Sequence, residues 1–315
     1  MHLVAPLAEL RRRLLAFLEG RSVAAEESEP DPSSAAPPPP DENPAVPRRV
    51  LPAQRWTPER LAVAGSLWGE GFVVPGGKEE VLRWLKPLWL KEESSLLVLG
   101  AGAGGGVPEA VQTFGCQVTA YEADPVLVAA ATKHIAKAGR AISRRTRVGV
   151  WSPQAPAFRK RSFDHALAME ALRGTLERPV AVADLLVALA GAIRPGGALV
   201  LVDVVGDNRL DPEDPVVSAW ARAECRVRRV PTEEGMVSAL GKLKFDVRVA
   251  EDITARHIHQ VMAGWMALLA ALEAQRPGHD RAAAVVAEAE VWLRRLRLMQ
   301  DGHVKLMRFH AISGY

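Results

Sequence analysis

The sequence predicts an α/β fold in which a doubly wound, mainly parallel sheet is covered by helices. Three observations lead to this prediction. Short apolar segments alternate with longer amphipathic ones between residues 96 and 204. One strand-like segment runs directly into a glycine cluster that opens a helix, at residues 96–106. Of the 315 residues, 48% are hydrophobic and 24% are charged, which is the balance of a globular domain with a sizeable core.

The first 50 residues differ from this pattern. Residues 1–20 carry leucines at helical spacing and three consecutive arginines, so we expect a short amphipathic helix. This helix either packs on its own domain or docks on a protein partner. Residues 21–50 are expected to form a flexible linker, because nine of the 23 prolines lie between Glu29 and Ala53 and large apolar residues are nearly absent.

The globular domain is predicted to cover residues 51–315. Thr57 and Pro58 are a helix cap and a first-turn residue, and they begin a helix that ends near residue 68. Helices are then expected at about 78–88, 108–114, 125–137 and 179–193, and strands at 96–99, 117–121, 146–151, 163–169 and 198–204. Single helices between strands indicate βαβ units and a parallel sheet.

The last part of the chain departs from this alternation. A helix at about 233–243 leads into a strand at 245–250, and a further strand at 304–312 follows much later. Between these two strands lie two long helical patterns, at about 255–273 and 282–299. We interpret residues 252–302 as a helical insertion that covers the domain.

The glycine cluster carries the clearest chemical signal. Gly100, Gly102 and Gly105 satisfy the spacing G-x-G-x-x-G, and glycines allow a sharp turn and the close approach of a ligand. Glu122 stands at the end of the next predicted strand, where a carboxylate accepts hydrogen bonds from the two hydroxyls of a ribose. Together they predict a nucleoside-containing cofactor, and they suit NAD and S-adenosylmethionine equally well.

Three further segments distinguish these cofactors. Residues 193–201, Ile-Arg-Pro-Gly-Gly-Ala-Leu-Val-Leu, resemble the turn and strand after the fourth helix of the class I S-adenosylmethionine-dependent methyltransferases. Residues 162–172 resemble the fourth-strand motif of that family, and residues 121–125 its acidic second-strand end. The resemblance covers about residues 56–315. It implies a Rossmann-like sheet with a terminal antiparallel strand, and it disfavours an NAD-dependent oxidoreductase.

The resemblance also implies S-adenosyl-L-methionine as the cofactor and suggests its contacts. By this resemblance, the cofactor-binding residues are Gly100, Ala101, Gly102 and Gly104 on the methionine and ribose side, Glu122 on the ribose, Ala123, Trp151 and Ser152 around the adenine, and Met169 beneath the methionine moiety. Two positions depart from the family pattern. Val98 stands where an acid is frequent, and Ser152 stands where an aspartate is frequent. These departures keep open a non-catalytic protein with the same fold.

Residues 67–77, Leu-Trp-Gly-Glu-Gly-Phe-Val-Val-Pro-Gly-Gly, resemble the lead-in of some small-molecule methyltransferases, including the phosphoethanolamine type. In those proteins the N-terminal segment folds over the cofactor. The tyrosine that the phosphoethanolamine type uses just before this stretch is missing, so its substrate does not carry over. Glycines around Glu70 and Phe72 predict a mobile loop that closes and excludes water. The alternative is a tight loop with Trp68 and Phe72 in the core.

Methyl transfer is an in-line displacement, so the protein mainly aligns donor and acceptor. A base is needed only where the acceptor must first lose a proton, and the residues predicted to be catalytic are Glu70, Glu170 and His257. His165 lies inside a predicted strand and is expected to be structural. His257 and His259 fall on different faces of one helix, so we expect no metal site.

Charge and cysteine content exclude other classes of function. The excess of 40 Lys and Arg over 37 Asp and Glu is too small for an electrostatic grip on nucleic acid. Two cysteines, Cys116 and Cys225, suit a reducing cytoplasm, and no apolar run reaches the length of a membrane span. The sequence therefore favours a cytoplasmic methyltransferase with a small-molecule acceptor. The alternative is a scaffold protein that recruits a partner through residues 1–20.

Overall fold

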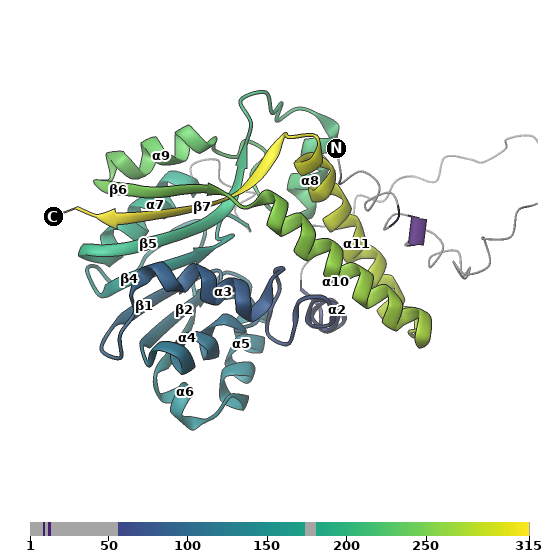
Figure 1. The fold of residues 1–315 in the computed structure, drawn as a ribbon, viewed down its shortest axis with the longest axis horizontal. Coiled ribbons are helices and arrows are strands. Elements are labelled where there is room, and N and C mark those ends of the chain that lie inside the picture. The colour runs from purple at the N-terminus through teal and green to yellow at the C-terminus, as the bar shows by residue number, and fades with distance from the viewer. Residues whose placement is uncertain (1–8, 10–11, 14–55, 174–180, 315) are drawn as a thin grey trace, which may run out of the picture.

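The computed structural model describes residues 9, 12–13, 56–173 and 181–314 of the chain. The predicted linker and nearly all of the predicted N-terminal helix lie outside the described residues. From residue 56 onward, helices and strands alternate as the sequence predicts (Figure 1).

Seven strands form one sheet in the order β3-β2-β1-β4-β5-β7-β6. The strands are β1 (Ser95–Leu99), β2 (Gln117–Glu122), β3 (Thr146–Val150), β4 (Phe163–Met169), β5 (Ile193–Gly206), β6 (Phe245–Asp252) and β7 (Val304–Ser313). Neighbours from β3 to β5 are parallel, and β7 is antiparallel to both β5 and β6. The predicted fold class is confirmed, including the antiparallel terminal strand.

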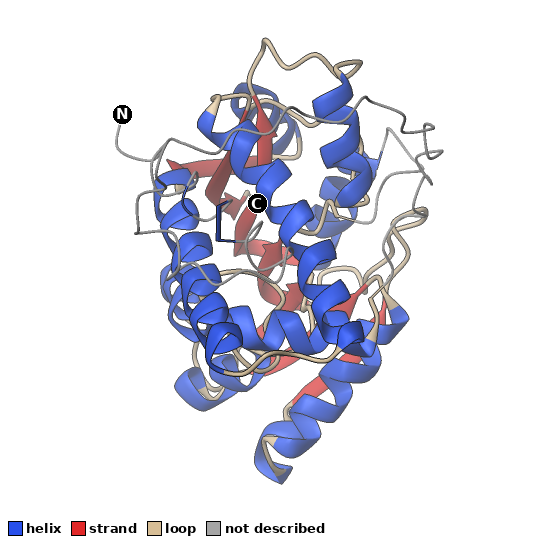
Figure 2. Ribbon diagram, turned by 90° about the vertical axis from the view of Figure 1, so that its right-hand side faces the viewer, coloured by secondary structure: helices blue, strands red, loops and turns tan. Residues whose placement is uncertain are grey.

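Helices lie on both faces of this sheet (Figures 1 and 2). The elements are α2 (Pro58–Trp68), α3 (Gly77–Leu85), the 3-10 helix η2 (Lys86–Leu88), α4 (Gly106–Phe114), α5 (Pro125–Lys137), α6 (Arg140–Arg144), α7 (Ala181–Ala192), α8 (Pro215–Ala223), α9 (Glu233–Lys242), α10 (Thr254–Ala274) and α11 (His279–Gln300). Alternation of side chains along the strands creates two cores. In β1, Val98 packs with α2 to α5, α10 and α11, whereas Leu97 and Leu99 pack with α7 and α9.

The two long helices α10 and α11 separate β6 from β7 and extend side by side at the right of Figure 1. They pack against α2 and α8. Trp265 and Trp292 are almost fully buried, and the ring of Trp292 meets that of Trp68 edge-on at 5.0 Å. Within the described part of the chain, no helix is long and apolar enough to cross a membrane.

Two helices were not predicted from the sequence. α6 has only five residues, too few for a periodic pattern, whereas α8 begins at Pro215 behind the capping residue Asp214. β5 also starts earlier than predicted, because Ile193 already pairs with Phe163 of β4.

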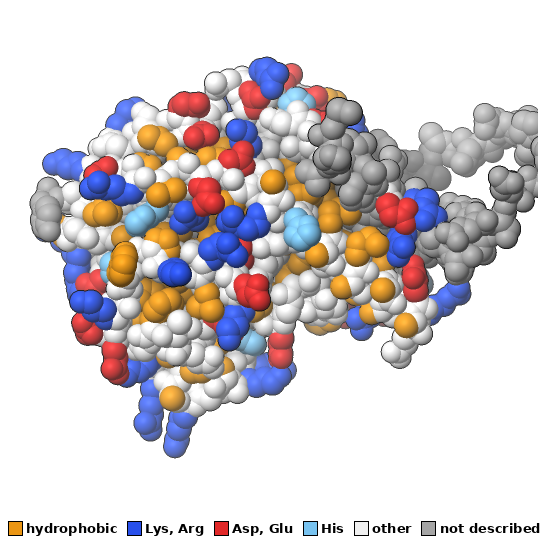
Figure 3. Space-filling model, viewed as in Figure 1, with side chains coloured by type: hydrophobic (Ala, Val, Ile, Leu, Met, Phe, Trp, Pro, Cys, Tyr) orange, Lys and Arg blue, Asp and Glu red, His pale blue; other side chains and the backbone are white. Residues whose placement is uncertain are grey.

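On the face shown in Figure 3, basic and acidic side chains are interspersed among uncharged ones.

Candidate active site

The glycine cluster forms a tight turn between β1 and α4. Gly100 and Gly102 have φ values of +75° and +57°, a left-handed conformation that favours glycine. The backbone N–H groups of Gly100 and Ala101 both donate to the carbonyl of Tyr121, at 3.0 and 3.2 Å. A Cβ atom at Gly100 would come within 2.1 Å of the carbonyl oxygen of Met169. The turn therefore holds the ends of β1, β2 and β4 closely together.

Glu122 reaches this turn from the end of β2. Its Oε2 accepts a hydrogen bond from the N–H of Gly102 at 2.8 Å, and its Oε1 accepts one from the N–H of Ala123 at 2.7 Å. Burial raises the pKa of Glu122, and the hydrogen bonds from the backbone oppose that effect. The N–H of Asp124 also bonds to this carboxylate, and a carboxylate has about four acceptor sites, so Glu122 can still accept a hydrogen bond from a ribose hydroxyl.

Trp151 follows β3 and lies beside Glu122. Its backbone N–H donates to the carbonyl of Glu122 at 3.2 Å, and its ring lies 6.3 Å from that of Phe158. The indole N–H of Trp151 is buried and has no acceptor among the described residues. Ser152 is exposed, and its hydroxyl bonds to Gln154 at 3.1 Å. The structure therefore brings Glu122, Ala123 and Trp151 together at the carboxyl ends of β2 and β3.

The lead-in loop between α2 and α3 covers the glycine cluster. The N–H of Gly105 donates to the carbonyl of Gly71 at 2.9 Å. A Cβ atom at Gly102 would lie 2.6 Å from the Val73 side chain, so this valine occupies the face of Gly102. Phe72 is partly buried against the core, and Trp68 is buried within it. The loop lies over the cluster, and Trp68 and Phe72 pack in or against the core as the tight-loop alternative expects, whereas the mobility of the loop stays a prediction.

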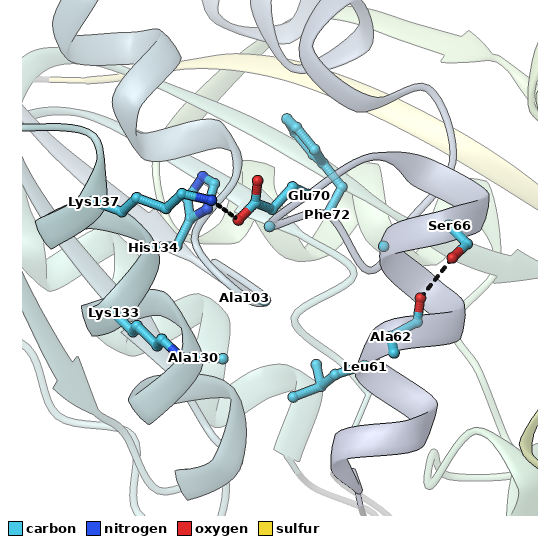
Figure 4. Close-up of a pocket in the computed structure, with 12 residues that line it drawn as sticks. Leu61, Ala62, Ser66, Glu70, Phe72, Ala103, Ala130, Lys133, His134 and Lys137 are labelled. Carbon is cyan, nitrogen blue, oxygen red and sulfur yellow. Dashed lines mark hydrogen bonds and ion pairs between the residues drawn. The ribbon is translucent and has the colours of Figure 1, made fainter. Parts of the chain in front are cut away.

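A pocket of about 580 Å³ opens between α2 and α5, beside this loop (Figure 4). It is lined by Leu61, Ala62, Gly65, Ser66, Glu70, Gly71, Phe72, Ala103, Ala130, Lys133, His134 and Lys137. Glu70 forms an ion pair with Lys137 at 2.7 Å, and this hydrogen bond lowers the pKa of Glu70. Ala103 is the part of the glycine cluster that reaches the pocket. The predicted cofactor-binding residues do not line it, so the pocket lies beside the predicted cofactor site.

A buried network of charges lies at the carboxyl ends of β4 and β5. Its members are Glu170 after β4, Asp203 in β5, Glu224 and Arg226 after α8, and Arg295 in α11, with His257 of α10 beside them. Arg295 donates to Glu170 at 2.9 Å and to Glu224 at 2.5 Å. Because all five charged side chains are buried, each needs a partner of opposite charge.

Arg226 completes this network from the other side. It donates to Glu224 at 2.9 Å, to Asp203 at 3.0 Å and to Glu170 at 3.4 Å. The remaining Asp203 oxygen accepts the N–H of Leu172 at 2.9 Å. Segments from β4, β5, α8 and α11 are therefore joined through two guanidinium groups.

The network contains two of the three residues that the sequence predicts to be catalytic. Burial alone would raise the pKa of Glu170, but the positive charge of Arg295 lowers it well below the usual range. His257 lies 3.4 Å from Arg295, and burial lowers its pKa to about 3, so the ring is neutral at neutral pH. Glu70 is exposed and pairs with Lys137 outside the network. Glu170 and His257 therefore meet at Arg295, and Glu70 stands apart.

Sequence reasoning missed Asp203, Glu224, Arg226 and Arg295. One signal was present, because Asp203 is a single acid within the apolar strand segment 198–205, and a buried acid requires a partner. The partners themselves come from distant helices, and nothing in their local sequence marks them as buried.

Comparison with known proteins agrees with this geometry. Residues 97–201 match the sequence model of the family described as "Methyltransferase domain". These residues are similar to a methyltransferase domain, and the sheet that holds them has the class I methyltransferase fold. The match begins in β1 and ends in β5, so it includes the glycine turn, Glu122 and Glu170. The predicted family resemblance is confirmed for this domain.

Solved structures show the same fold at low sequence identity. A phosphoethanolamine N-methyltransferase from Haemonchus contortus, bound to phosphomonomethylethanolamine and S-adenosylhomocysteine, superposes with a TM-score of 0.69 at 20% identity over 81% of this chain. The alignment covers 57% of that protein, so this chain spans little more than half its length. No curated protein matches the chain significantly.

Two more solved structures align with this chain over nearly their own whole length. A putative sarcosine dimethylglycine methyltransferase from Galdieria sulphuraria has a TM-score of 0.64 at 15% identity, over 81% of this chain and 98% of its own. A [4+2]-cyclase has a TM-score of 0.61 at 19% identity, over 82% of this chain and 92% of its own. At these identities the likeness establishes the fold of the methyltransferase domain, and this fold serves more than one reaction.

Proposed function

We propose that the chain is a methyltransferase that uses S-adenosyl-L-methionine and acts on a small-molecule acceptor. One observation carries this proposal: the Glu122 carboxylate is hydrogen-bonded to the glycine turn after β1. This arrangement places a hydroxyl-binding group next to the glycine turn, which the lead-in loop covers through Val73. The match of residues 97–201 to a methyltransferase domain supports the choice of cofactor.

The residues around this turn fit the cofactor. Glu122 would bind the ribose hydroxyls, and Ala123 with Trp151 would border the adenine, where the indole N–H lacks an acceptor among the described residues. Ser152, exposed at the same edge, would bond to the adenine from the solvent side. When bound, S-adenosylmethionine supplies an electrophilic methyl group. The residues of the chain then have to align the acceptor and exclude water.

In this proposal the three residues predicted to be catalytic have different roles. Glu170 and His257 act as positioning residues, because Arg295 satisfies the charge of Glu170 and burial keeps His257 neutral. They fix the end of β4 directly against Gly100, where Met169 contacts the turn. Glu70 lines the pocket in Figure 4, and it is the carboxylate that we propose to meet the acceptor.

The pocket also supports a small-molecule acceptor. Its volume of about 580 Å³ is typical of small-molecule sites. One wall is apolar, with Leu61 and Phe72, and the other carries Lys133, His134 and Lys137. An acceptor with an apolar body and a polar or anionic group would suit both walls.

Calorimetry with S-adenosylmethionine, S-adenosylhomocysteine and NAD tests the proposal. We expect both sulfur compounds to bind and Glu122→Ala to weaken them by about tenfold or more, since a hydrogen-bonded carboxylate contributes about 1.5–3 kcal/mol. Asp246→Ala is the matched control, because Asp246 is an acid paired with Arg248 on β6. Absence of binding by either sulfur compound, or tighter binding of NAD, would overturn the proposed cofactor.

A non-catalytic binding protein of the same fold is the second candidate. Val98 supports it, because this residue is 2% exposed inside the core and offers no carboxylate to the cofactor. Such a protein would bind partners through residues 1–20. Deleting residues 1–47 distinguishes the cases: a lost partner at unchanged stability supports docking, and a lower melting temperature supports packing on the domain. The free thiols of Cys116 and Cys225 support a cytoplasmic location for either candidate.

A further inference from the structure

A second groove lies on the sheet face opposite α4 and α5. Residues 151–162 connect β3 to β4 as a loop without a helix, so among the described residues no helix covers the amino-terminal part of β2 and β3 on this face. The groove has a volume of about 470 Å³. It is lined by Ser95, Gln117, Val118, Thr119, Tyr121, Arg144, Arg145, Thr146, Arg147, Val148, Gly149, Arg159, Ser162 and Phe163.

Strand register explains the floor of this groove. Thr119 pairs with Arg147, and Tyr121 pairs with Gly149, so these four side-chain positions share one face. The neighbouring residue Ala120 is buried on the opposite face, in the core under α4 and α5. A Cβ atom at Gly149 would lie 2.9 Å from the Tyr121 ring, so this glycine makes room for the ring beside the groove.

The charges that line the groove are all positive. Arg144, Arg145, Arg147 and Arg159 contribute to the lining, and no aspartate or glutamate does. Arg145 is held at the base by Glu92 at 2.5 Å and by the carbonyl of Gly115 at 2.7 Å.

The other three arginines are exposed and form no ion pair within the described part of the chain. Asp164 borders the groove through Ser95, but its carboxylate is already bonded to Ser95 and Arg194. The groove therefore holds several unneutralised guanidinium groups within a concave site.

We propose that this groove binds a small polyanion that carries phosphate groups. Guanidinium groups are planar and bind phosphate oxygens through two parallel hydrogen bonds, and Arg144, Arg147 and Arg159 line the groove from three different segments. Thr119 and Gln117 add neutral polar groups to the same lining. The volume suits a small molecule, not an extended acidic chain. The site is separate from the proposed cofactor site, which lies beyond Tyr121 at the carboxyl end of β2.

Titration calorimetry of the full chain with inorganic tripolyphosphate tests this inference. We expect saturable binding at low ionic strength and weaker binding as salt is added, since the arginines are exposed. Arg147→Ala and Arg159→Ala should each lower the affinity about tenfold, the effect of one charge-assisted contact. Arg147→Lys should lose less than Arg147→Ala, because it keeps the charge and loses the paired geometry.

Two controls separate this site from general charge and from the cofactor site. Arg228→Ala removes an exposed arginine that pairs with Glu213 outside the groove, and it should leave the affinity unchanged. Glu122→Ala should also leave it unchanged, so this inference stands or falls separately from the proposed function. The inference is overturned by an absence of saturable binding below about 10 mM tripolyphosphate, by an equal loss in Arg228→Ala, or by tighter binding of an oligoglutamate peptide.

Discussion

The glycine turn and the buried charge network lie at the carboxyl ends of neighbouring strands, but different parts of the chain build them. In the turn, the decisive hydrogen bond joins Glu122 to Gly102, only 20 positions earlier. In the network, Arg295 reaches Glu170 across 125 positions and Glu224 across 71. The turn is made mainly of backbone, and the network is made mainly of side chains held by tertiary packing. This difference determines which of the two can be read from local sequence and how each should respond to substitution.

The largest effect is expected when the network loses a cation. Arg295→Ala leaves Glu170 and Glu224 without their shared partner in a buried site, which should lower the free energy of unfolding by about 3–5 kcal/mol. Urea denaturation followed by circular dichroism measures this loss. Arg294→Ala is the control from the next position, an exposed arginine that pairs with Glu290. A loss below about 1 kcal/mol for Arg295→Ala would show that the network is not a structural centre.

A smaller effect is expected from the turn, where the backbone has to move. Gly100→Ala places a Cβ atom 2.1 Å from the carbonyl of Met169 and keeps a left-handed φ of +75°. We expect a stability loss of about 2–3 kcal/mol and a weaker binding of S-adenosylmethionine. Gly302 has the same φ of +75°, and a Cβ atom added there would meet no atom within 4 Å. Gly302→Ala should therefore cost only about 1 kcal/mol of backbone strain. Equal losses in the two variants would exclude close approach as the reason for Gly100.

The network should also make stability depend on pH. Burial lowers the pKa of His257 to about 3, so the unfolded chain binds a proton below pH 6.5 that the folded chain does not bind. Stability should therefore fall as the pH falls from 6.5, by up to about 1.4 kcal/mol per pH unit. Glu224 acts in the same direction at lower pH, because the charge of Arg295 overcomes burial and lowers its pKa to about 2, and its stabilising effect is lost between about pH 4.5 and 2.

Denaturation midpoints at pH 6.5 and 5.5 measure this dependence. His257→Gln should make the stability less dependent on pH. His259→Gln, which replaces an exposed histidine two positions further on, should leave the pH dependence unchanged. An unchanged slope in His257→Gln would assign the pH dependence to other groups.

The smallest effect is expected at the surface pair beside the turn. Glu70 and Lys137 are both 68% exposed, so solvent already screens their attraction. Glu70→Gln should leave the melting temperature unchanged within error, whereas a substitution of the buried Glu170 should lower it. Lys137→Gln removes the other partner of the pair and should also keep the melting temperature. The proposed contact with the acceptor is supported if Glu70→Gln lowers methyl transfer at an unchanged melting temperature, and it is contradicted if methyl transfer does not change.

The difference between the turn and the network also shows which features could be predicted from the sequence. Strand and helix positions followed from apolar periodicity, and the turn followed from three glycines and one acid at fixed spacing, since these are local signals. α8 was missed although Asp214 and Pro215 are start signals and Val217, Trp220 and Ala221 recur at helical spacing, so the local signal was present here. The network could not be predicted, because the burial of Arg226 and Arg295 depends on how α8 and α11 pack on the sheet. The arginine groove likewise required the register of β2 and β3, which places Arg147 opposite Thr119.

The position of β7 has a consequence for the order of folding. β7 lies between β5 and β6 in the sheet, although it follows both in the chain. During synthesis, β6 therefore leaves the ribosome with no neighbour to pair with, and α10 and α11 must be made before that neighbour exists. An unpaired strand edge promotes aggregation, so the interval before β7 emerges is the time at which the nascent chain is most exposed to misassembly. A stop codon after α11 would remove β7, which would leave β6 unpaired and β5 with an open edge.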